Sequence, residues 1–226
     1  MPIKAVLFDL GDTLIGNSLT AFETFQKILE KNSIHVTAKD VEEAFFTAKK
    51  ELNPPFEQLI GKIPLSEFYQ MWDSLVLKAL KVKDDGNLAR EINEQWFNVC
   101  GIILFPDVTP VLAMLKEKKI KTGIISNAYE EEIHHILTAV NLDDFNIIVG
   151  SDTVRNAKPH PEIFLHALKE LDITPEKAVY VGNDIEKDYK GAEKAGMNPL
   201  LIMREDADVS EVKYIKSLAE LAEYVE

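Results

Sequence analysis

The sequence is poor in cysteine and has no long apolar run. Cys100 is the one cysteine among 226 residues, which excludes an intrachain disulfide, and a lone cysteine among apolar neighbours is typical of a small buried side chain. No apolar run approaches membrane-spanning length, and the N-terminus lacks the charged and then apolar pattern of a signal peptide. These absences predict a cytoplasmic protein that does not associate with membranes.

Positive charge is also in short supply. The chain has 25 Lys and Arg residues against 38 Asp and Glu residues, so its formal net charge is −13. Nucleic-acid grooves need a basic stripe, and this balance argues against a nucleic-acid partner. It does not exclude a small anionic substrate, because one lysine and a bound cation can reverse the potential locally.

The hydrophobic pattern changes along the chain. The stretch "IKAVLFDL" is typical of a short buried strand, and residues 17–99 then carry apolar residues at helical spacing. From residue 100 onward, strands predicted within 119–127, 145–152, 177–184 and 199–205 alternate with helices. This alternation favours parallel pairing with helices on both faces of the sheet. We therefore predict an α/β fold with a Rossmann-like parallel sheet, built from residues 1–16 and 100–226, and an inserted helical cap formed by 17–99.

Polar residues follow the ends of the predicted strands. Ligands of open parallel sheets bind beyond the carboxyl ends of the strands, so these side chains are expected to meet at one edge. Each of them alone also fits an ordinary turn or helix cap. The residues concerned are Asp9, Asp12, Ser126, Asn127, Asp184 and Asp188, together with Lys158 from the stretch "NAKPHPEIF".

Considered together, these residue types indicate chemistry on phosphate. Clustered carboxylates repel one another unless protons or a cation compensate them. A small number of hard oxygen ligands suits Mg²⁺, which keeps several of its waters. A carboxylate, a divalent cation, a lysine and a hydroxyl–amide pair are the parts that handle a phosphoryl group, and an aspartate can itself be the nucleophile.

Four motifs occur in order along the chain: "FDLGDTL", "IISN", "KPHPEIF" and "YVGNDIEKDYKGAEKAGM". In this set the sequence resembles the haloacid dehalogenase-like (HAD) hydrolase superfamily, in the subgroup with a helical cap after the first strand. The resemblance spans the predicted core and implies a Mg²⁺-dependent hydrolase. The reaction that it favours is phosphatase action on a small phosphorylated metabolite.

The resemblance also implies a role for each motif residue. Asp9 would be the nucleophile and would form an aspartyl-phosphate, and Lys158 would neutralise charge between Asp9 and the phosphate. The phosphoryl oxygens would be bound by the hydroxyl groups of Thr13 and Ser126 and by the backbone N–H of Asn127. The Mg²⁺ ligands would be Asp9, the backbone carbonyl of Gly11 and Asp184, with Asp188 close behind.

Gly11 departs from the family pattern, because phosphatases of this family usually carry a second aspartate there as general acid and base. Residues three apart on an extended strand face opposite sides, so Asp12 is not an obvious substitute unless the strand ends before it. Three readings stay open. The chain is a phosphatase without this acid, a phosphonatase- or dehalogenase-type hydrolase on the same aspartate, or a phosphate-binding or regulatory protein with weak catalysis.

Overall fold

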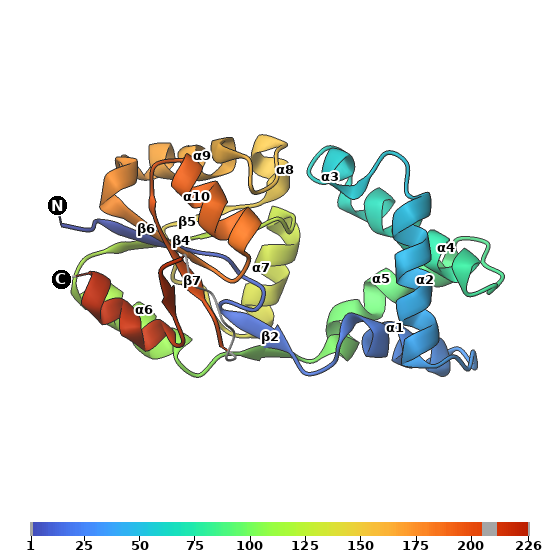
Figure 1. The fold of residues 1–226 in the computed structure, drawn as a ribbon. Coiled ribbons are helices and arrows are strands. Elements are labelled where there is room, and N and C mark those ends of the chain that lie inside the picture. Colours follow the sequence, from blue (N-terminus) through green and yellow to red (C-terminus); the bar gives the residue numbers. More distant parts are fainter. Residues whose placement is uncertain (1, 205–211, 226) are drawn as a thin grey trace. The chain divides into compact units, whose positions relative to one another are not determined.

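The computed structural model describes residues 2–204 and 212–225, and the chain divides into two compact units (Figure 1). Residues 1–16 and 104–226 form the first, which we call the core unit. Residues 17–103 form the second, the helical unit. The candidate site residues predicted from the sequence all belong to the core unit.

The core unit is built on a six-stranded sheet in the order β5-β4-β1-β6-β7-β8. Neighbouring strands are parallel, and β1 pairs with β4 on one side and β6 on the other, which places Phe8 level with Ile124 and Val181. The predicted α/β class with a parallel sheet is confirmed. The strands are β1 (Ala5–Phe8), β4 (Lys121–Ile125), β5 (Ile147–Val149), β6 (Ala178–Gly182), β7 (Asn198–Ile202) and β8 (Tyr214–Ile215). Of the strand predicted at 199–205, Glu205 lies outside the described residues.

Helices cover both faces of this sheet, with α9 and α10 on one face and α6 and the C-terminal η3 on the other (Figure 1). The side chains of Ala5 and Leu7 alternate toward the α9 face and pack there with Phe164. β1 is buried along its whole length, as expected of a central parallel strand. The helices are α6 (Val108–Glu117), α7 (Glu130–Ala139), α8 (Ser151–Val154), α9 (Pro161–Leu171), η1 (Pro175–Lys177), the π-helical turn η2 (Ile185–Tyr189), α10 (Lys190–Lys194) and the 3₁₀ helix η3 (Leu218–Tyr224).

The helical unit has its own apolar core. Thr20 and Thr37 begin α1 and α2 with capping boxes, in which each hydroxyl accepts from a backbone N–H three residues on. Phe45 is half-buried against this core, with ring centroids 5.3 Å from Phe22 and 5.4 Å from Trp72. The helices are α1 (Ala21–Lys31), α2 (Ala38–Glu51), α3 (Phe56–Leu59), α4 (Leu65–Ala79) and α5 (Asn87–Cys100).

Two short strands that the sequence pattern did not predict carry the chain out of the core unit and back. These are β2 (Ile15–Asn17) and β3 (Ile102–Leu104), which pair as a two-stranded sheet. At three residues each, they are too short for a period-two pattern to be recognised.

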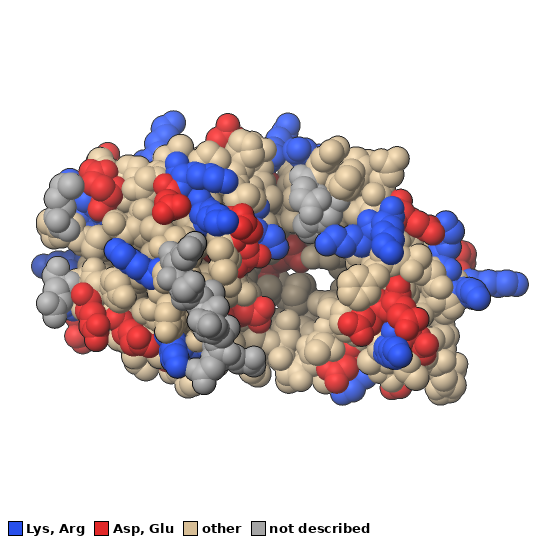
Figure 2. Space-filling model, viewed as in Figure 1, with Lys and Arg blue, Asp and Glu red and all other residues tan. Residues whose placement is uncertain are grey.

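The charge distribution on the surface and the hydrophobicity of the helices indicate which partners the protein could contact. Acidic and basic side chains are interspersed on the face seen in Figure 2. A search of the described helices finds none with the length and apolar character needed to cross a bilayer.

Candidate active site

The site begins at the carboxyl end of β1, where Asp9 follows Phe8. The backbone N–H of Asp9 donates to Val181 of β6, so the residue continues the strand by one step. Lys158, from the loop before α9, donates from Nζ to Asp9 Oδ1 over 2.6 Å. The exposed fractions of the two side chains are 12% for Asp9 and 3% for Lys158. A buried ion pair between residues 149 positions apart therefore forms at the predicted edge of the sheet.

Asp188 completes this charged group from the other side. Its Oδ1 atom accepts from Lys158 Nζ over 2.6 Å, and its Oδ2 atom accepts from the backbone N–H of Asp184 over 3.0 Å. Asp188 lies on the π-helical turn η2, directly against the end of β6. A Cβ atom at Gly182 would overlap the carboxyl carbon of Asp188, so the glycine allows this close approach.

Tyr180 is the third partner of the lysine. Its hydroxyl group accepts from Lys158 Nζ over 2.9 Å and donates to the carbonyl of Ile125 over 3.0 Å. The ring lies edge-on to Phe164, with centroids 4.9 Å apart, and the side chain is fully buried. The phenol thus connects the lysine to β4 and β6 inside the core.

Burial and charge shift the ionisation of these groups. Burial is the largest influence on Asp9 and raises its pKa to about 6, while Lys158 opposes the rise and Asp188 adds to it. Burial also works against the charge on Lys158, but the two carboxylates outweigh it and raise the pKa of the ammonium group. Burial and the same carboxylates raise the pKa of Tyr180 well above its ordinary value, so its phenol stays protonated. At neutral pH Asp9 is therefore mostly ionised, Lys158 carries its positive charge and the Tyr180 hydroxyl is neutral.

Thr13 lies in the loop after Asp9, and its buried hydroxyl has no hydrogen-bond partner among the described residues. Its carbonyl accepts from Arg204 Nη2 over 2.6 Å, and both terminal nitrogens of Arg204 reach the Asp107 carboxylate at 3.1 Å. Arg204 also stacks over Phe105 at 3.7 Å. Arg204 thus holds the loop of Thr13 in place, while the Thr13 hydroxyl remains unpaired. A buried hydroxyl without a partner is a candidate for binding a ligand.

Gly11 and Asp12 show how the strand ends. Both are exposed, and Asp12 has a left-handed backbone with φ of 55°. The extended conformation has ended before Asp12, so strand alternation does not decide where its side chain points. A Cβ atom built on Gly11 meets no heavy atom within 4 Å. The position expected to carry an acid in the family is therefore open space.

Ser126 and Asn127 follow β4. Asn127 binds the Lys158 backbone twice: its Oδ1 atom accepts from the Lys158 N–H over 2.7 Å, and its Nδ2 atom donates to the Lys158 carbonyl over 3.1 Å. Its side chain thus holds the lysine loop, a task that the sequence did not suggest. The Ser126 hydroxyl accepts from the backbone N–H of Ala128 over 3.2 Å, which leaves its own hydrogen available to a ligand.

Asp184 has a different environment from Asp9. Its Oδ1 atom accepts from the backbone N–H groups of Glu186 and Lys187, and its Oδ2 atom lies 3.3 Å from Lys187 Nζ. Partial burial works against the charge, but these hydrogen bonds and Lys187 outweigh it and lower the pKa. The carboxylate therefore caps η2 in this structure.

The described residues fit Mg²⁺ by the chemistry of their donors. Within the described ranges, no three His, Cys, Asp or Glu side chains are grouped to hold a metal ion. Mg²⁺ needs fewer, since it is usually bound by one or two carboxylates, waters and substrate phosphates. Asp9 supplies a carboxylate at the edge, and the Gly11 carbonyl accepts no hydrogen bond from any part of the chain that is described. These oxygens, with the carboxylate of Asp184 after β6, the strand next to β1, make a small hard-oxygen donor set.

The structure brings Asp9, Lys158 and Asp188 into direct contact. Ser126 follows β4, the strand next to β1, and Thr13 lies in the loop that follows Asp9. Sequence reasoning missed Tyr180 and Arg204. A tyrosine inside a buried aliphatic strand was the available signal for the first, because a buried hydroxyl needs a partner.

Known proteins resemble this chain over most of its length. A family model described as haloacid dehalogenase-like hydrolase matches residues 3–196. The glyceraldehyde 3-phosphate phosphatase of Methanopyrus kandleri is 29% identical over 205 residues, covering 89% of this chain and 84% of the relative. The phosphoglycolate phosphatase of Shigella dysenteriae is 25% identical over 209 residues, covering 86% and 79%. The HAD-hydrolase YfnB of Bacillus subtilis, solved with magnesium, has a TM-score of 0.76 at 21% identity, covering 100% of this chain and 99% of that one.

Proposed function

The chain belongs to the haloacid dehalogenase-like hydrolase family, and on that premise we propose that it is a Mg²⁺-dependent phosphatase of a small phosphorylated metabolite. The observation that carries the proposal is the buried group of Asp9, Lys158 and Asp188 at the carboxyl edge of the sheet. The two curated relatives named above are phosphatases of small phosphorylated compounds, which supports the same reaction. The substrate of this chain lies in the same chemical class.

In the proposed reaction, Asp9 attacks phosphorus with the carboxylate oxygen that Lys158 does not hold. A bond forms between that oxygen and phosphorus while the ester bond breaks, and the leaving oxygen takes the electron pair and a proton from water. Water then attacks the aspartyl-phosphate at phosphorus, which releases phosphate and restores Asp9. With a pKa of about 6, Asp9 is mostly ionised at neutral pH and is ready to attack.

The other residues stabilise the charge on the phosphoryl group. Lys158 faces it with a fixed positive charge, and the hydroxyl groups of Thr13 and Ser126 donate to its oxygens. Asp9, the Gly11 carbonyl and Asp184 would hold Mg²⁺, and Asp188 fixes Lys158 from behind. When bound, the cation supplies Lewis-acid stabilisation of the phosphoryl oxygens.

The proposal is tested by hydrolysis of an activated aryl phosphate with and without Mg²⁺. Wild type is expected to release phosphate only with Mg²⁺, and Asp9→Asn to reduce the rate to background. Asp172→Asn is the matched control, because Asp172 is exposed at the end of α9 and makes no contact with the site. Mass spectrometry of the acid-quenched reaction is expected to find the phosphoryl group on Asp9.

Other outcomes identify the other two readings. Wild type that binds inorganic phosphate but hydrolyses no ester would be a phosphate-binding or regulatory protein. Chloride release from a 2-haloacid without metal would assign dehalogenation to Asp9 and overturn the proposal. Cleavage of a phosphonate in place of a phosphate ester would assign phosphonatase chemistry to the same residue.

A further inference from the structure

The ammonium group of Lys158 is fully occupied inside the protein. A lysine has three N–H donors, and Nζ of Lys158 has three oxygen partners: Asp9 Oδ1 at 2.6 Å, Asp188 Oδ1 at 2.6 Å and Tyr180 Oη at 2.9 Å. No donor is left over for a phosphoryl oxygen while all three contacts stand. A substrate can gain a hydrogen bond from this lysine only by replacing one partner.

The exposure of the three partners indicates which one is replaced. The Asp9 side chain is 12% exposed and that of Asp188 is 2% exposed, while Tyr180 is fully buried. Asp9 is also the partner whose carboxylate charge is lost when it becomes an acyl phosphate. Tyr180 and Asp188 therefore keep their hydrogen bonds to Lys158 Nζ when the contact between Lys158 and Asp9 is exchanged.

We propose that Tyr180 is a positioning residue that holds Lys158 in place while Lys158 transfers one hydrogen bond from Asp9 to the phosphoryl group. This inference rests on the proposed function and adds a residue to it. The Tyr180 hydroxyl can do this because its own hydrogen has two acceptors, the Ile125 carbonyl at 3.0 Å and Asp188 Oδ1 at 3.2 Å, so its lone pairs can face the ammonium group. Ile125 precedes Ser126, so the same phenol connects the lysine to the strand end that carries Ser126.

The inference is tested by a double-mutant cycle between Tyr180→Phe and Lys158→Met, measured as kcat/KM for an aryl phosphate. Phe keeps the ring packed on Phe164 and removes only the hydroxyl group. A hydrogen bond to a charged group supports an effect of about tenfold. We expect Tyr180→Phe to lower kcat/KM about tenfold when Lys158 is present and by less than about twofold in the Lys158→Met background.

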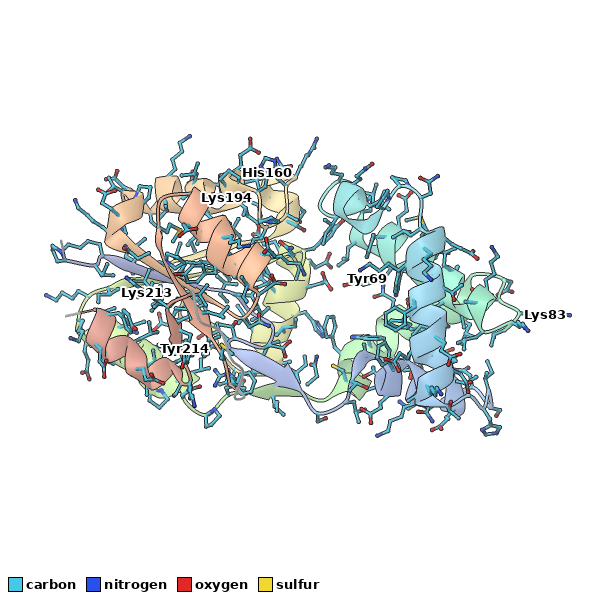
Figure 3. All side chains as sticks on the ribbon, viewed as in Figure 1. Tyr69, Lys83, His160, Lys194, Lys213 and Tyr214 are labelled. Carbon is cyan, nitrogen blue, oxygen red and sulfur yellow. The ribbon has the colours of Figure 1, made fainter. Side chains whose placement is uncertain are left out.

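A matched control and a second readout keep the cycle decisive. Tyr214→Phe removes a hydroxyl from a tyrosine of β8 that is 42% exposed (Figure 3), and it is expected to leave kcat/KM unchanged. The second readout is the dissociation constant for inorganic phosphate, measured by calorimetry for all four members of the cycle. This constant reports on Lys158 even where the Lys158→Met variant hydrolyses too slowly to assay. We expect the effects of the two substitutions on phosphate binding to be non-additive, as for kcat/KM.

The outcomes separate the inference from the proposed function. An equal loss in both backgrounds would make Tyr180 a packing residue, and no loss in either would remove it from the site; each overturns the inference while phosphatase activity stands. Wild type that hydrolyses no phosphate ester refutes the proposed function, and the phosphate-binding cycle then decides on Tyr180 alone. A wild-type protein that also binds no phosphate overturns both.

Discussion

A carboxyl group placed at position 11 is expected to accelerate the hydrolysis of phosphate esters with poor leaving groups. The change is Gly11→Asp. The backbone of Gly11 is not in the left-handed region, and a Cβ atom there has no heavy atom within 4 Å. An aspartate therefore fits without strain, and its cost to folding is within about 0.5 kcal/mol, as for other exposed sites.

Two opposing effects set the size of the gain. General acid–base help contributes roughly 10²–10⁴ in rate. A third carboxylate also raises the pKa of Asp9, which is already about 6. A further rise of one unit would leave about half of Asp9 ionised at pH 7 and would cost only about a factor of two. The acid–base term is larger, so we expect kcat/KM for an alkyl phosphate to rise by about 10², the lower end of the range.

The assay compares an alkyl phosphate with p-nitrophenyl phosphate, whose leaving group needs little protonation. The gain is expected to be large for the first substrate and small for the second. Gly11→Asn is the matched control, since it adds the same volume and keeps the backbone carbonyl but cannot transfer a proton. If Gly11→Asp is no faster than Gly11→Asn on the alkyl phosphate, the missing acid does not limit the rate and the reasoning is wrong.

Three further changes test residues other than Gly11, two of them in the core unit and one in the helical unit. Gly182→Ala should push Asp188 away from β6 and lower kcat/KM on the order of 10²-fold, in line with small misplacements at other active sites. Burial raises the pKa of Asp73 in α4 well above its ordinary value of 3.8, and Asp84 adds to the rise. The native state therefore holds a proton that the unfolded chain releases. As a result, the free energy of unfolding falls as the pH rises above 3.8. Asp73→Asn should remove this fall and raise the Tm at pH 7.5 by a few degrees, at about 2–4 °C per kcal/mol. Arg204→Met leaves the Asp107 carboxylate without its cation, while Ser217 and Leu218 still donate to it. The change should lower the unfolding free energy by about 2 kcal/mol, less than for a fully buried pair.

Each of these changes has a result that contradicts it. Full activity in a folded Gly182→Ala protein would mean that the position of Asp188 is not critical. An unchanged pH dependence of the Tm in Asp73→Asn would exclude a proton on Asp73 in the native state. Lys116→Met breaks an exposed ion pair of the core unit, with side chains 74% and 67% exposed, and should cost less than about 1 kcal/mol. An Arg204→Met effect no larger than this would show that the Arg204–Asp107 pair contributes little.

Much of the fold could be predicted from the pattern of apolar residues. The change from helical spacing in 17–99 to alternating strands and helices predicted a parallel sheet with a helical insertion, and the six-stranded parallel sheet agrees. The order of the strands was not predicted. The short β2 and β3 were missed, because three residues give no period to recognise. The π-helical form of η2 was missed too.

By itself the sequence determined which residues follow the strands, and parallel pairing then requires Asp9 and Ser126 to lie at the same edge of the sheet. That they follow neighbouring strands was decided by the strand order of the folded sheet. It also determined that Gly11 offers a carbonyl and no acid. Only the tertiary structure decided that Lys158 is shared by two carboxylates and a phenol, because a loop, a π-helical turn and a buried strand meet at its Nζ atom. Lys158 is separated along the chain by 149 positions from Asp9, by 30 from Asp188 and by 22 from Tyr180. Packing at such separations leaves no local pattern in a sequence.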